Sequence, residues 1–199
     1  MINENDLYIE TLKEKLKSVD DSELVELVNR LINERMYLAE TVNIDPLTGL
    51  YNRRVLSNVR EVGALIMCDI DDFKMVNDTF GHDTGDKVLK SVSQIIMRNV
   101  RVGDIVCRFG GDEFMIIFGT DKKDVVKNRM EKMCSDVTRI IKLDDFDVTL
   151  SVGVAFNENN FDVESMFEMA DKALYRSKEN GKNQITYYDN AKTLIKDNN

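Results

Sequence analysis

The chain has 199 residues, of which 43% are hydrophobic and 32% charged, and its formal net charge is −9. This length and composition indicate one globular domain of ordinary size plus an extension. The negative charge disfavours nucleic acid or an anionic membrane as a partner, although it does not exclude a nucleotide ligand. The apolar runs are shorter than the roughly 20 residues of a membrane span, and the N-terminus lacks the basic and apolar regions of a signal peptide. We therefore expect a cytoplasmic protein without a membrane segment.

The N-terminal part, residues 6–42, has the periodicity of helices. A short first helix ends before Asp20–Glu23, where Asp20 and Glu23 have the spacing of a capping box. The second helix carries a heptad pattern that is under three repeats long and has one charged core position. Its d positions are Leu24, Leu31 and Leu38, and its a positions are Val28, Arg35 and Val42. A dimerising stalk or signal relay and a helix that packs on its own domain both remain open.

After Asp45–Pro46 the pattern changes to alternating helices and strands, which is typical of an α/β domain. We expect helices at 48–59, 73–79, 84–99, 121–140 and 162–179, and strands at 61–70, 147–154 and 184–188. The three cysteines Cys68, Cys107 and Cys134 lie in apolar surroundings without CxxC spacing, so we expect free thiols.

One of these strands ends in acidic residues. The continuous apolar run 62–70 is followed at once by carboxylates, in the order Asp69-Ile70-Asp71-Asp72. Buried strands of α/β sheets commonly present metal or nucleotide sites at such an end. An EF-hand is excluded, because Lys74 stands where that loop requires glycine. A P-loop is excluded, because residues 81–87 lack its spacing and its Gly-Lys-Ser/Thr end.

A glycine pair separates two further apolar stretches. Residues 105–109 and 114–118 flank Gly110-Gly111-Asp112-Glu113, a pattern that predicts a tight β-hairpin. Adjacent carboxylates suit Mg²⁺, and glycine lets a ligand approach the main chain. The alternative is a solvated acidic turn. The two acidic clusters form one metal site only if their strands are neighbours, which sequence order does not establish.

Six collinear blocks of this sequence resemble the GGDEF family of diguanylate cyclases, over roughly residues 43–188. They are Asp45–Arg54, Asp69–Leu89, Arg101–Asp104, Arg108–Phe114, Ser151–Ala155 and Ala170–Lys178. The resemblance implies an α/β fold like that of nucleotidyl cyclases, a sandwich with a central, mostly antiparallel sheet flanked by helices. The expected organisation is a helical extension at 1–42, a catalytic domain at 43–190 and a polar tail at 191–199.

The resemblance also implies a reaction. Family members bind one GTP per subunit and act as homodimers, in which the 3′-hydroxyl of each GTP attacks the α-phosphate of the other. The expected product is cyclic di-GMP (c-di-GMP) with two pyrophosphates, and the expected cofactor is Mg²⁺ (or Mn²⁺), two ions per active site. Two alternatives remain: a catalytically silent domain that binds GTP or c-di-GMP, and a cyclase that makes cyclic GMP-AMP.

Site residues follow from the family's motif positions. The expected metal ligands are Asp69, the Ile70 carbonyl, Asp112 and Glu113, and the catalytic residues are Asp112, Glu113 and Lys74. Phosphate contacts are expected from Lys74, Lys172, Arg176 and the amides near Asp72 and Phe73. Asn77 and Asp86 match guanine-reading positions, because a carboxylate accepts hydrogen bonds from guanine N1 and N2. His82 matches a position near the nucleotide.

A final motif, Arg101-Val102-Gly103-Asp104, matches the family's site for inhibition by its product. Arg and Asp in this register can bind guanine and phosphate of c-di-GMP. The second basic residue of that site aligns with Lys132, which lacks the planar fork of arginine, and Arg129 is an alternative. A solvated turn is the non-functional interpretation of the same residues.

Overall fold

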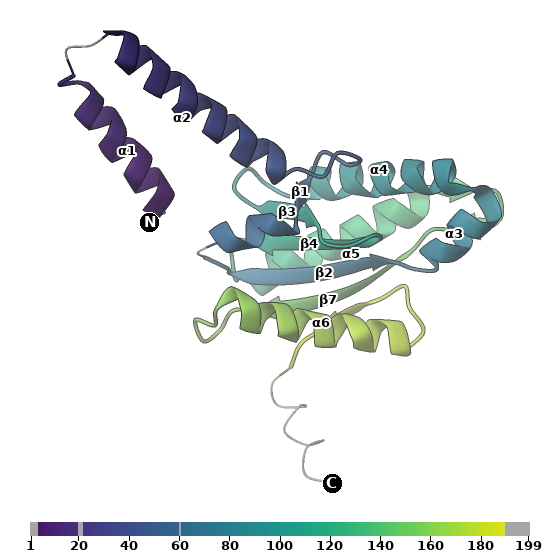
Figure 1. Ribbon diagram of the computed structural model, residues 1–199. Coiled ribbons are helices and arrows are strands. Elements are labelled where there is room, and N and C mark those ends of the chain that lie inside the picture. The colour runs from purple at the N-terminus through teal and green to yellow at the C-terminus, as the bar shows by residue number, and fades with distance from the viewer. Residues whose placement is uncertain (1–3, 20–21, 60, 190–199) are drawn as a thin grey trace. The chain divides into compact units, whose positions relative to one another are not determined.

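A computed structural model describes residues 4–19, 22–59 and 61–189 of the chain (Figure 1). The chain divides into two compact units, residues 1–44 and 45–199. Within the described ranges, no helix is long and apolar enough to span a membrane.

The first unit contains two helices, α1 (Glu4–Leu16) and α2 (Ser22–Val42). The break between them falls where the sequence indicates it, although Asp20 of the expected capping box lies outside the described residues. On α2, the side chains of Leu24, Leu27 and Leu31 are about half exposed, at 46%, 55% and 56%. This unit therefore presents an apolar stripe on α2.

The second unit is built on a six-stranded sheet in the order β1-β3-β4-β2-β7-β8. The central strand β2 is antiparallel to β4 and to β7, whereas β1 pairs with β3 and β8 with β7 in parallel. The strands are β1 (Tyr51–Asn52), β2 (Ala64–Ile70), β3 (Ile105–Arg108), β4 (Glu113–Phe118), β7 (Leu150–Phe156) and β8 (Ile185–Tyr187). Every residue of β2 is buried, as the continuous apolar run predicts.

Helices cover both faces of this sheet and create two cores. The helices are α3 (Phe73–Phe80), α4 (His82–Asn99), α5 (Lys123–Ile140) and α6 (Val163–Glu179), with a 3-10 helix η1 at Arg53–Asn58. Alternate β2 residues such as Ile66 and Cys68 pack with α3, α4 and α5, whereas Leu65 and Met67 pack with α6 and η1. This is the expected sandwich, a mostly antiparallel sheet between helical layers.

The helix expected at 48–59 is wrong. The Asp45 side chain accepts hydrogen bonds from the main-chain N–H and the hydroxyl of Thr48, and Gly49 has φ of +72°. Asn52 then accepts from the Arg54 N–H and begins η1. These local side-chain hydrogen bonds replace the helical ones, so the segment forms a turn, the short strand β1 and a 3-10 helix.

The strand expected at 147–154 begins later, at Leu150. Residues before it form a separate hairpin of β5 (Lys142–Leu143) and β6 (Phe146–Asp147), which the sequence analysis missed. Asp144 turns this hairpin with φ of +46°, a conformation that Asp tolerates better than most residues. The apolar pattern across 146–150 therefore conceals a break in the strand.

All three cysteines are free, and Cys68 and Cys107 are buried. Burial raises the pKa of Cys107 and of Cys134 to about 12, so both are neutral thiols at physiological pH. They contribute to packing.

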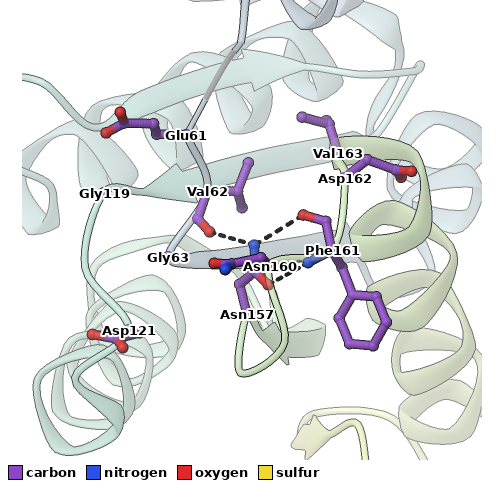
Figure 2. Close-up of a pocket in the computed structure, with 10 residues that line it drawn as sticks. All are labelled: Glu61, Val62, Gly63, Gly119, Asp121, Asn157, Asn160, Phe161, Asp162 and Val163. Atoms are coloured by element: carbon purple, nitrogen blue, oxygen red, sulfur yellow. Dashed lines mark hydrogen bonds between the residues drawn. The ribbon is translucent and has the colours of Figure 1, made fainter.

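A pocket of about 410 Å³ lies at the start of β2, at the end of that strand opposite to Asp69 (Figure 2). The amide of Asn157 joins its walls: Nδ2 donates to the carbonyls of Val62 at 2.8 Å and Phe161 at 3.0 Å, and Oδ1 accepts from the Phe161 N–H at 2.8 Å. The hydrogen-bonding groups of Asn157 are thus used within the protein, where they join the segments around Val62 and Phe161.

Replacing this amide should destabilise the domain. We expect Asn157→Ala to lower the free energy of unfolding by about 2 kcal/mol, because three main-chain groups lose their partner. Chemical denaturation with unchanged m-value measures the loss. Asp121→Asn, on the exposed rim of the same pocket, is the control and should change stability by less than about 0.5 kcal/mol. Equal stability of Asn157→Ala and the wild type would contradict this role.

Candidate active site

The two acidic clusters meet because their strands are neighbours. In the β2–β4 pair, Asp69 lies directly opposite Glu113. The N–H of Ile70 donates to the main-chain carbonyl of Asp112 at 3.2 Å, which extends the pairing by one step. The glycine loop thus places Asp112 and Glu113 beside the end of β2.

The hairpin is closed by its own main chain. The N–H groups of Phe109 and Gly110 both donate to the Glu113 carbonyl, at 2.8 and 3.3 Å. A Cβ on Gly110 would lie 2.6 Å from Oε2 of Glu113, so this carboxylate folds back over the loop. Glycine at position 110 is therefore needed for the observed orientation of Glu113.

The clustered carboxylates shift the titration of Asp69. Burial, with smaller contributions from the charges of Asp112 and Glu113, raises the pKa of Asp69 to about 6 against the opposing effect of Lys178. The Nζ of Lys178 lies 2.7 Å from Oδ2 of Asp69. An anionic Asp69 thus depends on a neighbouring cation.

This donor set fits a hard divalent cation. Carboxylates of Asp69 and Asp112 and a main-chain carbonyl are the oxygen ligands that Mg²⁺ prefers. In the part of the chain that the structure describes, no three His, Cys, Asp or Glu side chains converge as a metal-binding group. The remaining ligands must therefore come from main-chain oxygen, substrate or water, as is usual for Mg²⁺ at phosphate sites.

The other two acids after β2 have different roles. Asp71 is 5% exposed and accepts hydrogen bonds from the hydroxyls of Thr149 and Ser151 and from the Asn183 N–H, at 2.7, 2.6 and 3.0 Å. It joins β7 to the segment before β8. Asp72 precedes α3 with φ of +54°, and its Oδ1 is 2.7 Å from Nζ of Lys182.

A pocket of about 490 Å³ opens beside the hairpin, between α3, α4 and the glycine loop. It brings together six of the residues expected to bind substrate or metal: Phe73, Lys74, Asn77, His82, Asp86 and Asp112. Arg108 and Gly111 line it as well. A Cβ on Gly85 would lie 2.0 Å from the side-chain oxygen of Asn77, so this glycine in α4 makes room for Asn77.

The RxxD motif forms a compact turn whose acid is already paired. The Arg101 N–H donates to Oδ2 of Asp104 at 2.8 Å, and Nη1 of Arg129 lies 3.1 Å from the same oxygen. Lys132 instead pairs with Asp136 at 2.6 Å. The structure therefore places Arg129, and not Lys132, against the motif.

The family model for the diguanylate cyclase GGDEF domain matches residues 42–184. The chain belongs to the GGDEF family. Diguanylate cyclase DosC of Escherichia coli is 35% identical over 180 residues, covering 82% of this chain and 38% of that protein. Diguanylate cyclase A of Treponema denticola is 34% identical over 175 residues, covering 85% and 47%. The GGDEF chain thus spans less than half the length of these two relatives.

Solved structures show the same fold. The coiled coil and GGDEF domain of DgcB from Caulobacter crescentus, in complex with c-di-GMP, matches with a TM-score of 0.72 and 29% identity, covering 83% of this chain and 96% of that one. Diguanylate cyclase SiaD from Pseudomonas aeruginosa, in complex with its activator SiaC, matches with a TM-score of 0.67 and 28% identity, covering 92% and 76%.

Two basic residues of this GGDEF domain were missed by the sequence analysis. The expected phosphate contacts on α6 were Lys172 and Arg176, yet Lys172 lies 3.8 Å from Glu168 on its own helix. Lys178 instead pairs with Asp69 near the end of β2, and Lys182 pairs with Asp72 just after that strand. Lys178 lies two residues before Asn180-Gly181 and Lys182 directly after it, and this position at the helix end is the signal that could have found them.

Proposed function

We propose that this protein is a cytoplasmic diguanylate cyclase that condenses two GTP molecules into c-di-GMP and two pyrophosphates. The observation that carries the proposal is the placement of Asp69 opposite Glu113 on paired strands, with Asp112 lining a pocket that also contains Lys74 and Asp86. One end of the sheet thus combines carboxylates for metal binding, the positively charged Lys74 for phosphate and the hydrogen-bond acceptor Asp86 for guanine. The activities named for its relatives support the same assignment.

Guanine recognition is assigned to Asp86 and Asn77, which line the pocket from α4 and α3. The Asp86 carboxylate accepts hydrogen bonds from N1–H and N2–H, a donor pair that adenine lacks, while Asn77 offers both a donor and an acceptor. A site built on such hydrogen bonds discriminates strongly against a base that leaves them unmade. His82 lies in the same pocket, where it contacts the nucleotide without acting as a base.

Asp69, Asp112 and the Ile70 carbonyl would hold two Mg²⁺ (or Mn²⁺) ions, with help from Glu113. When bound, these cations lower the pKa of the 3′-hydroxyl and neutralise phosphate charge. Glu113, held over Gly110, orients the hydroxyl or accepts its proton.

The phosphates are bound from two sides. Lys74 approaches from α3 within the pocket, and the N–H groups at the start of α3, near Asp72 and Phe73, add main-chain donors. From the opposite side, Lys178 and Lys182 supply positive charge beside Asp69 and Asp72. We assign to these two lysines the role first expected of Lys172 and Arg176.

Alanine variants separate these assignments. We expect Lys178→Ala and Lys182→Ala each to lower kcat/KM for GTP by roughly 10- to 100-fold, the effect of losing one hydrogen bond to a charged group. Lys172→Ala is the matched control, and its kcat/KM should stay within about threefold of the wild type. Steady-state kinetics of c-di-GMP formation distinguish the outcomes; a large loss in Lys172→Ala alone would restore the first assignment.

The reaction needs two subunits, each with one GTP, facing one another. The exposed leucines of α2 suit a dimerising stalk, and the DgcB structure that matches this chain includes a coiled coil. SiaD, which also matches across most of this chain, was solved with an activator bound. We infer that the helical extension promotes dimerisation and is a point of control.

Product inhibition is assigned to Arg101, Asp104 and Arg129. Arg129→Met keeps an unbranched apolar side chain but removes the guanidinium, whose central carbon lies 5.3 Å from the Phe118 ring centroid. We expect it to raise the c-di-GMP concentration for half-inhibition by roughly tenfold or more. Lys132→Met should change that concentration by less than about threefold, because Lys132 pairs with Asp136. Inhibition curves at fixed GTP test this, and the reverse ranking would return the role to Lys132.

The direct test of the function is turnover by the purified chain with GTP and Mg²⁺. The proposal requires one c-di-GMP for every two pyrophosphates released, and a rate per chain that rises with protein concentration as dimers form. Binding of GTP or c-di-GMP without any turnover, at protein concentrations where the chain is dimeric, would instead identify a silent receptor.

A further inference from the structure

Arg108 holds the glycine loop from within the hairpin. It lies at the end of β3, and its Nε and Nη2 both donate to the carbonyl of Gly111, at 3.0 and 2.7 Å. Gly111 is the residue directly before Asp112. A Cβ at Gly111 would meet nothing within 4 Å, and the two hydrogen bonds from Arg108 tie the Gly111 carbonyl to the end of β3.

The same guanidinium binds Asp45. Its Nη1 lies 3.3 Å from both carboxylate oxygens, and each of the two side chains is 17% exposed. Oδ1 of Asp45 also accepts from the N–H and hydroxyl of Thr48, at 2.9 and 2.6 Å. Burial raises the pKa of Asp45, but the hydrogen bonds from Thr48 and the charge of Arg108 outweigh burial and lower it. The carboxylate is therefore charged at neutral pH.

Asp45 is the first residue of the catalytic unit and follows closely on the end of α2 at Val42. The segment it begins continues into β1, which pairs in parallel with Cys107 and Arg108 of β3. This segment thus holds the hairpin twice, by strand pairing and through the Arg108 side chain.

We propose that Arg108 is a positioning residue for the reaction, that Asp45 completes its clamp on Gly111, and that the segment following the helical extension thereby sets the position of Asp112 and Glu113. The inference rests on the proposed cyclase activity. Three nitrogens of the guanidinium are engaged inside the protein, so Arg108 acts through the loop. A small displacement of catalytic groups slows the chemical step strongly, with little effect on ground-state binding. The signature is therefore a fall in kcat with KM preserved.

The test compares the 199-residue chain with its Arg108→Lys, Asp45→Asn and double variants. Lysine keeps the charge but cannot hold Gly111 and Asp45 together. We expect kcat to fall about 100-fold in Arg108→Lys and about tenfold in Asp45→Asn, with KM for GTP within about twofold of the wild type. The double variant should be no slower than Arg108→Lys, because both changes release the same clamp.

Two controls separate positioning from general stability. Thr48→Ala weakens the same turn but leaves the Asp45–Arg108 pair intact, and Lys142→Ala breaks an exposed pair with Asp147 in the β5–β6 hairpin. Both should keep kcat within about twofold. Asp45→Asn retains the oxygen that binds Thr48, so the turn should fold, which a thermal melt checks.

Other kinetic results would each contradict one part of the proposed roles of Arg108 and Asp45. If Asp45→Asn has the kcat of the wild type, Asp45 is not part of the clamp. If the losses in kcat add up in the double variant, Asp45 and Arg108 do not act together. A rise in KM with unchanged kcat in Arg108→Lys shows direct substrate binding instead of positioning. An equal loss in Thr48→Ala shows a merely structural turn. Failure of the wild type itself to make c-di-GMP refutes the proposed function, and the variants then have no activity to compare.

Discussion

Asp112→Asn is expected to lower kcat for c-di-GMP formation by about 10³-fold while leaving the protein folded. The substitution removes one of the proposed anionic ligands, and metal ions at such sites contribute several kcal/mol of transition-state stabilisation. The fold should tolerate it, because the main-chain carbonyl of residue 112, and not its side chain, accepts the bond from Ile70.

Two measurements accompany this prediction. Without Mg²⁺, the melting temperature of Asp112→Asn should equal or exceed that of the wild type, since the charge of Asp112 opposes ionisation of Asp69. Asp147→Asn, an exposed acid in the β5–β6 hairpin, is the charge-matched control and should retain full activity. If the kcat of Asp112→Asn remains within tenfold of the wild-type value, Asp112 is not a ligand of the metal site.

Gly153→Ala is expected to lower the free energy of unfolding of the second unit, residues 45–199, by about 3 kcal/mol or more. A Cβ at this position of β7 would lie 2.2 Å from the carbonyl of Ala170 and 2.2 Å from the N–H nitrogen of Leu174, both main-chain atoms of α6. Because the backbone cannot rotate away as a side chain can, α6 must move off the sheet. A thermal melt should show a fall in Tm of roughly 6–12 °C.

The control for this prediction is Gly119→Ala, since a Cβ at Gly119 would meet nothing within 4 Å. Its melting temperature should remain within about 2 °C of the wild type. If Gly153→Ala melts at the wild-type temperature, the close approach of α6 to β7 is not needed for stability. Because α6 carries Lys178 in its last turn and Lys182 follows shortly after its end, a displaced helix should lower activity as well.

The elements that sequence reasoning placed well are those whose pattern is long and unbroken. The buried run of β2 and the apolar stripe of α4 were placed to within a few residues, because burial on both faces and helical periodicity leave strong signals. The helix predicted after Asp45 does not form, because the side chains of Asp45 and Asn52 accept hydrogen bonds from nearby main-chain N–H groups. Hydrophobic periodicity does not reveal such bonds.

For the site, the motif positions predict residues that the structure brings into one pocket, but they do not predict which side chains form ion pairs with one another. Asn77 and Asp86, placed by motif, line one pocket with Asp112. The motif match predicted Lys172 and Arg176 on α6, whereas the lysines that the structure places beside Asp69 and Asp72 are Lys178 and Lys182. Likewise, the partner of Asp104 depends on which side chain of α5 faces the turn, and only the structure shows that it is Arg129.

The most direct measurement is mass spectrometry of the products formed from equimolar GTP and ATP with Mg²⁺. We predict c-di-GMP as the sole cyclic dinucleotide from the wild type and none from Asp112→Asn. A mixed guanine–adenine product would contradict the role given to Asp86 while preserving the metal site. Absence of any cyclic dinucleotide, from a folded dimer that binds GTP, would contradict the proposed diguanylate cyclase activity.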